Sequence, residues 1–198
     1  MRIGILGGTF DPPHLGHLIA AVQMKERLRF DEVWLMPVAS HAFGKKLTSP
    51  SHRLSMTKLL ECTGLIASDF EIKLGGISST FHTMRALKKD FPKHSFTFCI
   101  GSDLISDFQK WDNWKELISE NPLAIYPRGY ESSDIIKHAE TVMGKGLMSQ
   151  ITVIQGEDVV VTNISSTIIR KRIQEGYLVD HLVHPDVLKY ITQFKLYR

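Results

Sequence analysis

Short apolar runs alternate with longer amphipathic stretches along this chain, and this alternation restricts the possible fold more than any other feature. The apolar runs have the length of buried strands, and the stretches between them have the length of helices. Strands separated by helices are typical of βα units, because two parallel strands can be joined only by a long crossover connection. We therefore predict an α/β fold of the Rossmann-like, doubly wound type, with a mostly parallel sheet and helices on both of its faces.

The individual elements follow from the same pattern. Strands are predicted at residues 2–6, 32–37, 70–73, 95–100, 123–126 and 151–154. Helices are predicted at residues 17–29, 51–61, 80–91, 166–175 and 184–194, and Gly176 stands where a helix C-cap is expected. A long loop lies between residues 38 and 50, and loops of this length often carry function.

Length, charge and cysteine content limit the classes of protein. The chain has 198 residues, which suits one domain over residues 1–198, and no stretch has the composition of a flexible linker. Its formal charge of +3 fits a protein that handles anionic small molecules but is too weak and dispersed to indicate nucleic-acid binding. The apolar start at residues 3–6 is far too short to span a bilayer. Two distant cysteines, Cys62 and Cys99, and no signal peptide lead us to expect a reducing, cytoplasmic location away from membranes.

A glycine turn with two histidines follows the first predicted strand. Residues 7–17 read Gly-Gly-Thr-Phe-Asp-Pro-Pro-His-Leu-Gly-His. Glycines let the backbone approach a ligand closely, and the N–H groups at the start of a helix favour an anion. The imidazoles of His14 and His17 can donate hydrogen bonds to phosphate oxygens and stabilise charge that develops in a phosphoryl-type transition state. The segment therefore predicts a phosphate site.

The histidine pair also has two simpler explanations when it is taken alone. His14 could cap a loop and His17 a helix, and an isolated His-x-x-His is more often structural or metal-binding than catalytic. Metal binding has little support, because no third His, Cys or carboxylate follows at a typical ligand spacing. Capping and catalysis both stay open on these residues alone.

A second motif, near the end of the chain, adds a resemblance. Residues 164–170 read Ile-Ser-Ser-Thr-Ile-Ile-Arg, and Ser165, Ser166 and Thr167 supply a helix N-cap. Arg170 and the helix start offer a second anion site. Alone, this motif is commonplace and structural capping is the better explanation. Together and in this order, the two motifs resemble the signatures of the nucleotidyltransferase superfamily that carries the HxGH motif.

Within that superfamily the chain is most similar to the bacterial nicotinate-nucleotide adenylyltransferases, over nearly its whole length. The resemblance includes Gly101-Ser102-Asp103 with a tryptophan downstream. It implies that His14 and His17 contact the phosphates of ATP, with His17 the more critical. It also implies that Asp103 holds the ribose hydroxyls and that Arg170 binds the β- or γ-phosphate. The implied ATP-binding set is completed by Gly8, Thr9, Phe10, Gly101, Ser165, Ser166 and Thr167.

The resemblance implies an acceptor site as well. Trp111 would stack on a pyridine ring, Thr80 would contact the substrate, and Lys45 and Arg128 complete the set. The chain departs from the family pattern around this acceptor site. Residues 40–46 read Ser-His-Ala-Phe-Gly-Lys-Lys where many members have Pro-Pro-His-Lys, Ser79 replaces a tyrosine, and Asp112 replaces an aromatic residue.

The implied reaction transfers AMP from ATP to nicotinate mononucleotide and yields nicotinate adenine dinucleotide and pyrophosphate. A phosphate monoester is already anionic at neutral pH, since its second pKa is ~6, so no general base is expected. Mg²⁺ is expected as the cofactor, held by phosphates and water, with no metal ligand from the protein. Nicotinamide mononucleotide or phosphopantetheine as acceptor, or a nucleotide-binding homologue without catalysis, are the alternatives. No oligomeric state is predicted.

Overall fold

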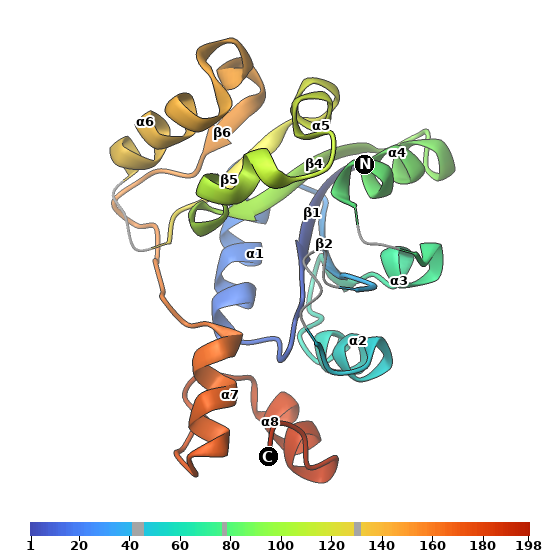
Figure 1. Cartoon of the computed structure of the whole chain (residues 1–198), viewed down its shortest axis with the longest axis vertical. Helices are drawn as coiled ribbons and strands as arrows, with labels where there is room; N and C mark the ends of the chain where they lie inside the picture. Colours follow the sequence, from blue (N-terminus) through green and yellow to red (C-terminus); the bar gives the residue numbers. More distant parts are fainter. Residues whose placement is uncertain (41–45, 77–78, 129–131) are drawn as a thin grey trace.

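A six-stranded sheet forms the centre of the computed structural model, which describes residues 1–40, 46–76, 79–128 and 132–198 (Figure 1). Its strand order is β3-β2-β1-β4-β5-β6, and every pairing is parallel. The strands are β1 (Arg2–Gly8), β2 (Glu32–Pro37), β3 (Leu65–Ala67), β4 (Ser95–Gly101), β5 (Leu123–Tyr126) and β6 (Ile151–Val153). The predicted doubly wound α/β fold is confirmed, and the described sheet is wholly parallel.

Helices connect these strands and follow the last one. They are α1 (Leu15–Leu28), α2 (Pro50–Lys58), α3 (Phe70–Leu74), α4 (Thr80–Asp90), α5 (Trp114–Glu120), α6 (Ser132–Met143), α7 (Ser166–Gln174) and α8 (Pro185–Gln193). Two 3₁₀ segments, η1 (Ser102–Lys110) and η2 (Lys145–Gln150), complete the described elements. Among the described residues, no helix is both long enough and apolar enough to span a bilayer.

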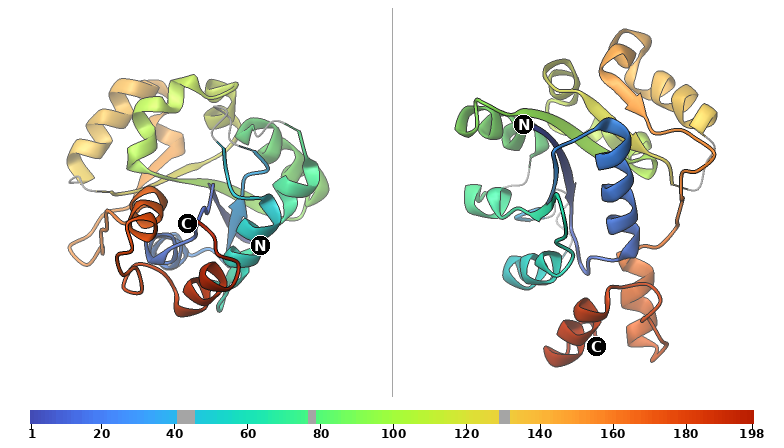
Figure 2. Two further views of the ribbon diagram at one scale, coloured as in Figure 1. Left: turned by 60° about the horizontal axis from the view of Figure 1, so that its bottom comes forward. Right: turned by 180° about the vertical axis from the view of Figure 1, so that it is seen from behind.

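Helices cover both faces of the sheet, because successive strand residues point to opposite sides. Ile3 and Ile5 of β1 pack with α4, α5, α6 and η1, whereas Leu6 belongs to the cluster formed with α1, α2, α7 and α8. Figure 2 shows α1 on one side of β1 and the α4–α5 layer on the other. Strands that are buried on both faces have near-continuous apolar sequences, and this explains why the strand pattern was readable.

One predicted strand is wrong. Residues 70–73 form helix α3, and the third strand of the sheet is β3, five residues earlier. The sequence Phe-Glu-Ile-Lys alternates apolar and polar residues and so imitates a strand, but a run this short has no decisive period. Gly64, with φ of 76°, makes the turn that brings Leu65–Ala67 alongside β2.

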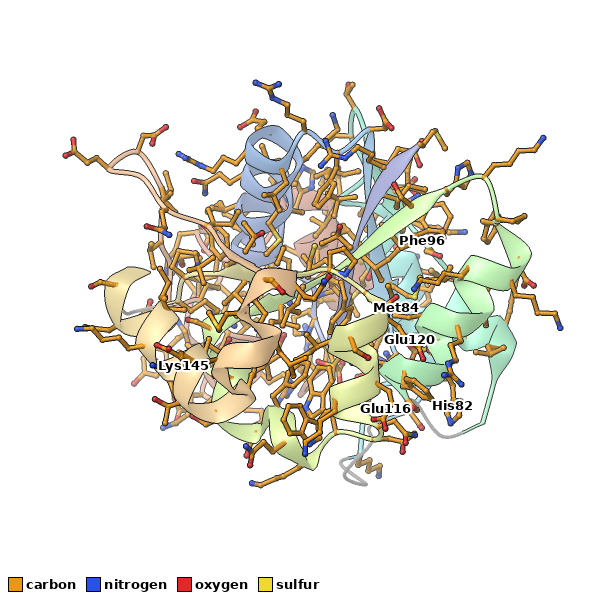
Figure 3. All side chains as sticks on the ribbon, turned by 90° about the horizontal axis from the view of Figure 1, so that it is seen from above. His82, Met84, Phe96, Glu116, Glu120 and Lys145 are labelled. Carbon is orange, nitrogen blue, oxygen red and sulfur yellow. The ribbon has the colours of Figure 1, made fainter. Side chains whose placement is uncertain are left out.

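Helical segments between β4 and β6 lie outside the predicted set. In α6 the buried residues Ile135, Ala139 and Met143 recur at a spacing of four, which is a helical signal. Helix α5 is fixed to α4 by Arg85, whose Nε donates to Oε2 of Glu120 at 3.0 Å. In Figure 3, Glu120 of α5 lies next to α4.

The last two helices share the core of the sheet. Ile169 of α7 and Val187 and Ile191 of α8 are buried in the same cluster as Ala21 and Met24 of α1. Gly176 follows α7 with φ of 77°, the left-handed conformation expected just after a helix C-terminus. This shared core supports the prediction of a single domain over residues 1–198.

The tightest glycine contact in β1 gives a test of the packing. A Cβ atom on Gly4 would lie 2.8 Å from ring atoms of Phe30 and 3.2 Å from Val33. We predict that Gly4→Ala lowers the free energy of unfolding by about 1–3 kcal/mol, because overpacking displaces these side chains. Chemical denaturation measures the change. Gly146→Ala is the matched control, since a Cβ there meets nothing within 4 Å; equal losses in both variants would contradict the packing argument.

Candidate active site

Because all strands of the described sheet run in the same direction, the candidate residues lie at one edge of the sheet. Gly8 ends β1, Gly101 ends β4 and Tyr126 ends β5, and all three ends are carboxyl ends of parallel strands. The chain leaves β1 toward β2 on one side and returns to β4 on the other, so the strand order reverses between β1 and β4. Ligands of open α/β sheets bind outside the carboxyl ends at such a reversal.

The loop from Thr9 to His14 connects β1 to α1. Phe10 has φ of 48° and is fully buried in the core, whereas Gly8 and Thr9 before it are partly exposed. A Cβ on Gly8 would lie 3.3 Å from the Phe10 ring, so a larger residue there would crowd the turn. The Asp11–Pro12 peptide bond is cis. The partly exposed part of the turn, Gly8 and Thr9, is therefore where the backbone is accessible to a ligand.

His14 and His17 lie against each other at the start of α1. Their ring centroids are 3.7 Å apart in a stacked arrangement, and His14 is the N-cap residue. The backbone N–H of His14 donates to Nδ1 of His17 at 3.2 Å. Since Nδ1 accepts, the proton of a neutral His17 ring belongs on Nε2, which can then donate to a ligand. A Cβ on Gly16 would lie 3.0 Å from Nδ1 of His14, so glycine between them allows the stack.

Both histidines are held in the neutral state. Burial, and then the nearby positive charge of Arg128, lower the pKa of His14 to about 3. Burial, His14 and Arg128 also lower the pKa of His17 well below its ordinary value. The helix start itself is partly engaged, because the N–H of Leu15 donates to the carbonyl of Leu182 at 3.0 Å. Neutral imidazole N–H groups are therefore the chemistry that this pair offers.

The second sequence motif packs directly against this loop. Ser165 caps α7, accepting from the N–H of Ile168, and Ser166 Oγ donates to the carbonyl of Pro12 at 2.8 Å. Arg170 Nη1 donates to the carbonyl of Asp11 at 2.6 Å, and its Nη2 donates to Thr167 Oγ1 at 3.2 Å. Two motifs more than 150 positions apart in the sequence are thus in direct contact.

Asp103 and Arg128 form a third part of the same edge. Arg128 Nη1 lies 3.1 Å from Asp103 Oδ2, and its Nη2 donates to the carbonyl of Ile164 at 2.7 Å. A Cβ on Gly101 would lie 2.4 Å from Asp103 Oδ1 and 2.8 Å from Cδ of Arg128, so a larger residue there would displace both side chains. Arg128 therefore connects the ends of β4 and β5 with the second motif, and its charge acts on the histidines.

Of the residues expected at the acceptor, Arg128 belongs to this cluster of contacts, and Thr80 and Trp111 each follow or precede a residue of one hydrogen-bonded pair. Thr80 begins α4, and the preceding Ser79 donates through Oγ to Asp112 Oδ2 at 2.9 Å. Trp111 is half-buried and stacks on Phe108, with ring centroids 4.8 Å apart. One face of its ring is therefore covered, and stacking on a ligand would need the other. Lys45 lies outside the described residues.

Sequence reasoning missed a buried polar group beneath the loop. Arg53 is 1% exposed, and its guanidinium donates to the carbonyls of Thr9, Thr48 and Ala39 at 2.9, 2.9 and 3.2 Å. Nothing in the sequence around Arg53 distinguishes it from a solvated helix arginine. Only its burial, seen in three dimensions, assigns it to the support of the loop.

No group of three His, Cys, Asp or Glu side chains that could hold a metal ion occurs in the described ranges. The carboxylate of Asp103, at the same edge of the sheet, is engaged by Arg128. A cation held mainly by a ligand's own phosphates and by water would need no such group.

The cytidylyltransferase-like family model matches residues 5–172. A protein of Clostridium botulinum, named "Probable nicotinate-nucleotide adenylyltransferase", is 34% identical over 202 residues, covering 100% of this chain and 98% of the relative. A Flavobacterium johnsoniae protein of the same name is also 34% identical, with both chains covered completely. The chain belongs to the nicotinate-nucleotide adenylyltransferase family. The family predicted from the two motifs is therefore confirmed.

Solved structures of similar proteins have the same fold as this chain. The nicotinic acid mononucleotide adenylyltransferase of Plasmodium falciparum, complexed with NaAD, superposes with a TM-score of 0.82 at 24% identity, covering 99% of this chain and 97% of that one. A Vibrio parahaemolyticus structure described as a nicotinate-nucleotide adenylyltransferase gives 0.69 at 21% identity, covering 100% and 95%. At these identities the structures establish the fold of this family member, and its residue roles are argued from its own geometry.

The depressed histidine pKa values predict how stability depends on pH. Between the folded-state pKa of His14, about 3, and its ordinary value of 6.5, the unfolded chain binds a proton that the folded chain does not. The free energy of unfolding should therefore fall as the pH drops below 6.5. We predict a shallower fall for His14→Gln, measured by denaturant titrations from about pH 7 to about pH 4. An unchanged slope would show that His14 is not buried in its neutral form.

Proposed function

We propose that this protein transfers AMP from ATP to the phosphate of nicotinate mononucleotide, with release of pyrophosphate. The observation that carries the proposal is the contact between the two motifs, in which Arg170 donates to the loop that holds His14 and His17. Arg128, which contacts Ile164 of the second motif, adds a second guanidinium group. Two neutral imidazoles and two guanidinium groups therefore lie at one edge of the sheet. Such a set of donors suits a polyphosphate and the charge that develops on it during transfer.

In the proposed reaction, an oxygen of the acceptor phosphate forms a bond to the α-phosphorus of ATP, and the bond from that phosphorus to the pyrophosphate oxygen breaks. His17 donates from Nε2 to the phosphates, because its Nδ1 is occupied by the N–H of His14. Arg170 binds the β- or γ-phosphate, and Asp103 holds the ribose. The nucleophile is already anionic, so the protein contributes positioning and charge stabilisation and no base.

Besides the predicted binding of substrate, we propose that Arg128 has a structural role in the nucleotide site. It pairs with Asp103 and holds the carbonyl of Ile164, so it fixes two parts of the nucleotide site relative to each other. Burial is the main cause of the low pKa of both histidines, and the charge of Arg128 lowers it further. A bound polyphosphate would offset that charge and would therefore raise the pKa of both imidazoles.

The acceptor is supported by family membership and by the pairing of Thr80 with Trp111 through Ser79 and Asp112. The exposed face of Trp111 is the proposed platform for the pyridine ring. Ser79 and Asp112 stand where the family has aromatic residues, and they are hydrogen-bonded to each other. A polar pair therefore takes the positions of those aromatic side chains. Nicotinate mononucleotide therefore remains the proposed acceptor, and Lys45 remains a predicted contact to its phosphate.

We further propose that Mg²⁺ accompanies ATP and is held by the phosphates and water, where it would neutralise phosphate charge. The residues of the described ranges fit this arrangement, because it asks for no protein cage. A cytoplasmic location also stays a proposal. The free thiols of Cys62 and Cys99 agree with a reducing compartment.

An acceptor panel tests the proposed function. Pyrophosphate release is measured with ATP and Mg²⁺ and with nicotinate mononucleotide, nicotinamide mononucleotide or phosphopantetheine. We expect nicotinate mononucleotide to give the highest kcat/KM. A higher kcat/KM with phosphopantetheine would overturn the acceptor, and no release with any acceptor would identify a nucleotide-binding protein without catalysis.

A substitution of His17 tests the catalytic assignment. Removal of one donor to a developing negative charge costs about 10²–10³ in rate, so His17→Ala should lower kcat by that factor. His94→Ala is the control, because His94 precedes β4 and lies at the opposite edge of the sheet. Steady-state kinetics at saturating ATP measures both variants, and near-normal turnover of His17→Ala would refute the role of His17.

A further inference from the structure

A buried carboxylate joins the loop of the first motif to the last residues of the sequence. Asp11 is 3% exposed. Its Oδ1 accepts from the hydroxyl of Tyr197 at 2.6 Å, and its Oδ2 accepts from the N–H of Thr48 at 3.0 Å. Burial and the neighbouring carboxylate raise the pKa of Tyr197, so the hydroxyl stays protonated and remains a donor.

The backbone of the same residue holds a proposed phosphate ligand. The carbonyl oxygen of Asp11 accepts from Arg170 Nη1 at 2.6 Å. One residue later, the carbonyl of Pro12 accepts from Ser166 at 2.8 Å. Asp11 is therefore the point at which Tyr197, Thr48 and Arg170 meet, and a rotation of its peptide group would move Arg170.

Buried Arg53 also holds the loop, and this limits how the loop can move if a contact of Asp11 is lost. Arg53 binds the carbonyls of Thr9 and Thr48, on the two segments that Asp11 joins. With these contacts fixed, loss of the Tyr197 hydroxyl leaves a buried carboxylate oxygen without its donor. A buried carboxylate in that state turns toward another donor, since leaving it unpaired is costly. Thr48 and Arg170 are the donors that its residue already contacts.

From this network we infer that Tyr197 is a positioning residue for adenylyl transfer, which acts through Asp11 to orient Arg170 toward the phosphates of ATP. The inference rests on the proposed function. It assigns to Tyr197 no contact with substrate. Its effect should fall on ATP and leave the acceptor largely unaffected, because Arg170 and the histidine loop form the nucleotide part of the site.

The chain offers a matched control for this role. Tyr190 of α8 also uses its hydroxyl in a half-buried contact, 2.9 Å from Nδ1 of His52 on α2. It contacts neither the loop of the first motif nor Arg170 through any hydrogen bond of the described residues. Tyr190→Phe and Tyr197→Phe therefore remove the same group from the same end of the molecule, and only one of them should disturb the nucleotide site.

The test compares wild type, Tyr197→Phe, Tyr190→Phe, Arg170→Ala and the Tyr197→Phe/Arg170→Ala double variant. Calorimetry with ATP and Mg²⁺ in the absence of acceptor gives Kd, and steady-state kinetics gives KM for each substrate. We expect Tyr197→Phe to weaken ATP binding roughly tenfold to a hundredfold, with less than a threefold change in the acceptor KM. Tyr190→Phe should change neither. In the Arg170→Ala background, Tyr197→Phe should have little further effect.

Three results would overturn the inference. They are an ATP Kd in Tyr197→Phe within threefold of that in Tyr190→Phe, effects of Tyr197 and Arg170 that multiply, and a Tyr197→Phe variant that does not fold. The proposed function is judged separately, from wild-type turnover on the acceptor panel. ATP binding without acceptor therefore tests Tyr197 even if the acceptor proves to be another phosphate.

Discussion

All strands of the described sheet run in the same direction, and this constraint determines where chemistry can occur. Parallel strands require a crossover after each strand, so every loop that leaves a carboxyl end lies at one edge. The order β3-β2-β1-β4-β5-β6 then separates the loops after β1 and β4, which turn to opposite sides. The loop with His14, the turn at Gly101 and the segment at Arg128 meet there because of strand direction alone. Helix α7 closes the edge from outside the sheet.

The electrostatics of this edge follow from burial. Two stacked imidazoles beside a guanidinium cannot all be charged, and the histidines give up their protons. The positive charge of the site therefore comes from Arg128 and Arg170, which hydrogen-bond to carbonyls of the protein as well. Donors that are fixed before a ligand arrives need little reorganisation when charge develops.

Local patterns in the sequence were sufficient for much of the fold and for half of the site. Strands buried on both faces read as apolar runs, and the two motifs contain most of their chemistry within a few positions. The pattern failed for β3 and α3, where each element is too short to show a period. It also failed for Arg53, Asp11 and Tyr197, because their roles depend on contacts between distant segments, and Asp11 and Tyr197 are 186 positions apart. Lys45 lies outside the described residues, so its role stays a prediction from the sequence.

The hydrogen bond between Asp11 and Tyr197 has a consequence for biosynthesis. A chain emerging from the ribosome makes β1 and its loop first, and Tyr197, the donor for Asp11, follows 186 positions later. Contacts of such long sequence separation form late, because a large loop must close before they contribute. The nascent chain can therefore form much of its sheet and yet lack a finished nucleotide site. Full affinity for ATP would therefore arise only after residue 197 has left the exit tunnel.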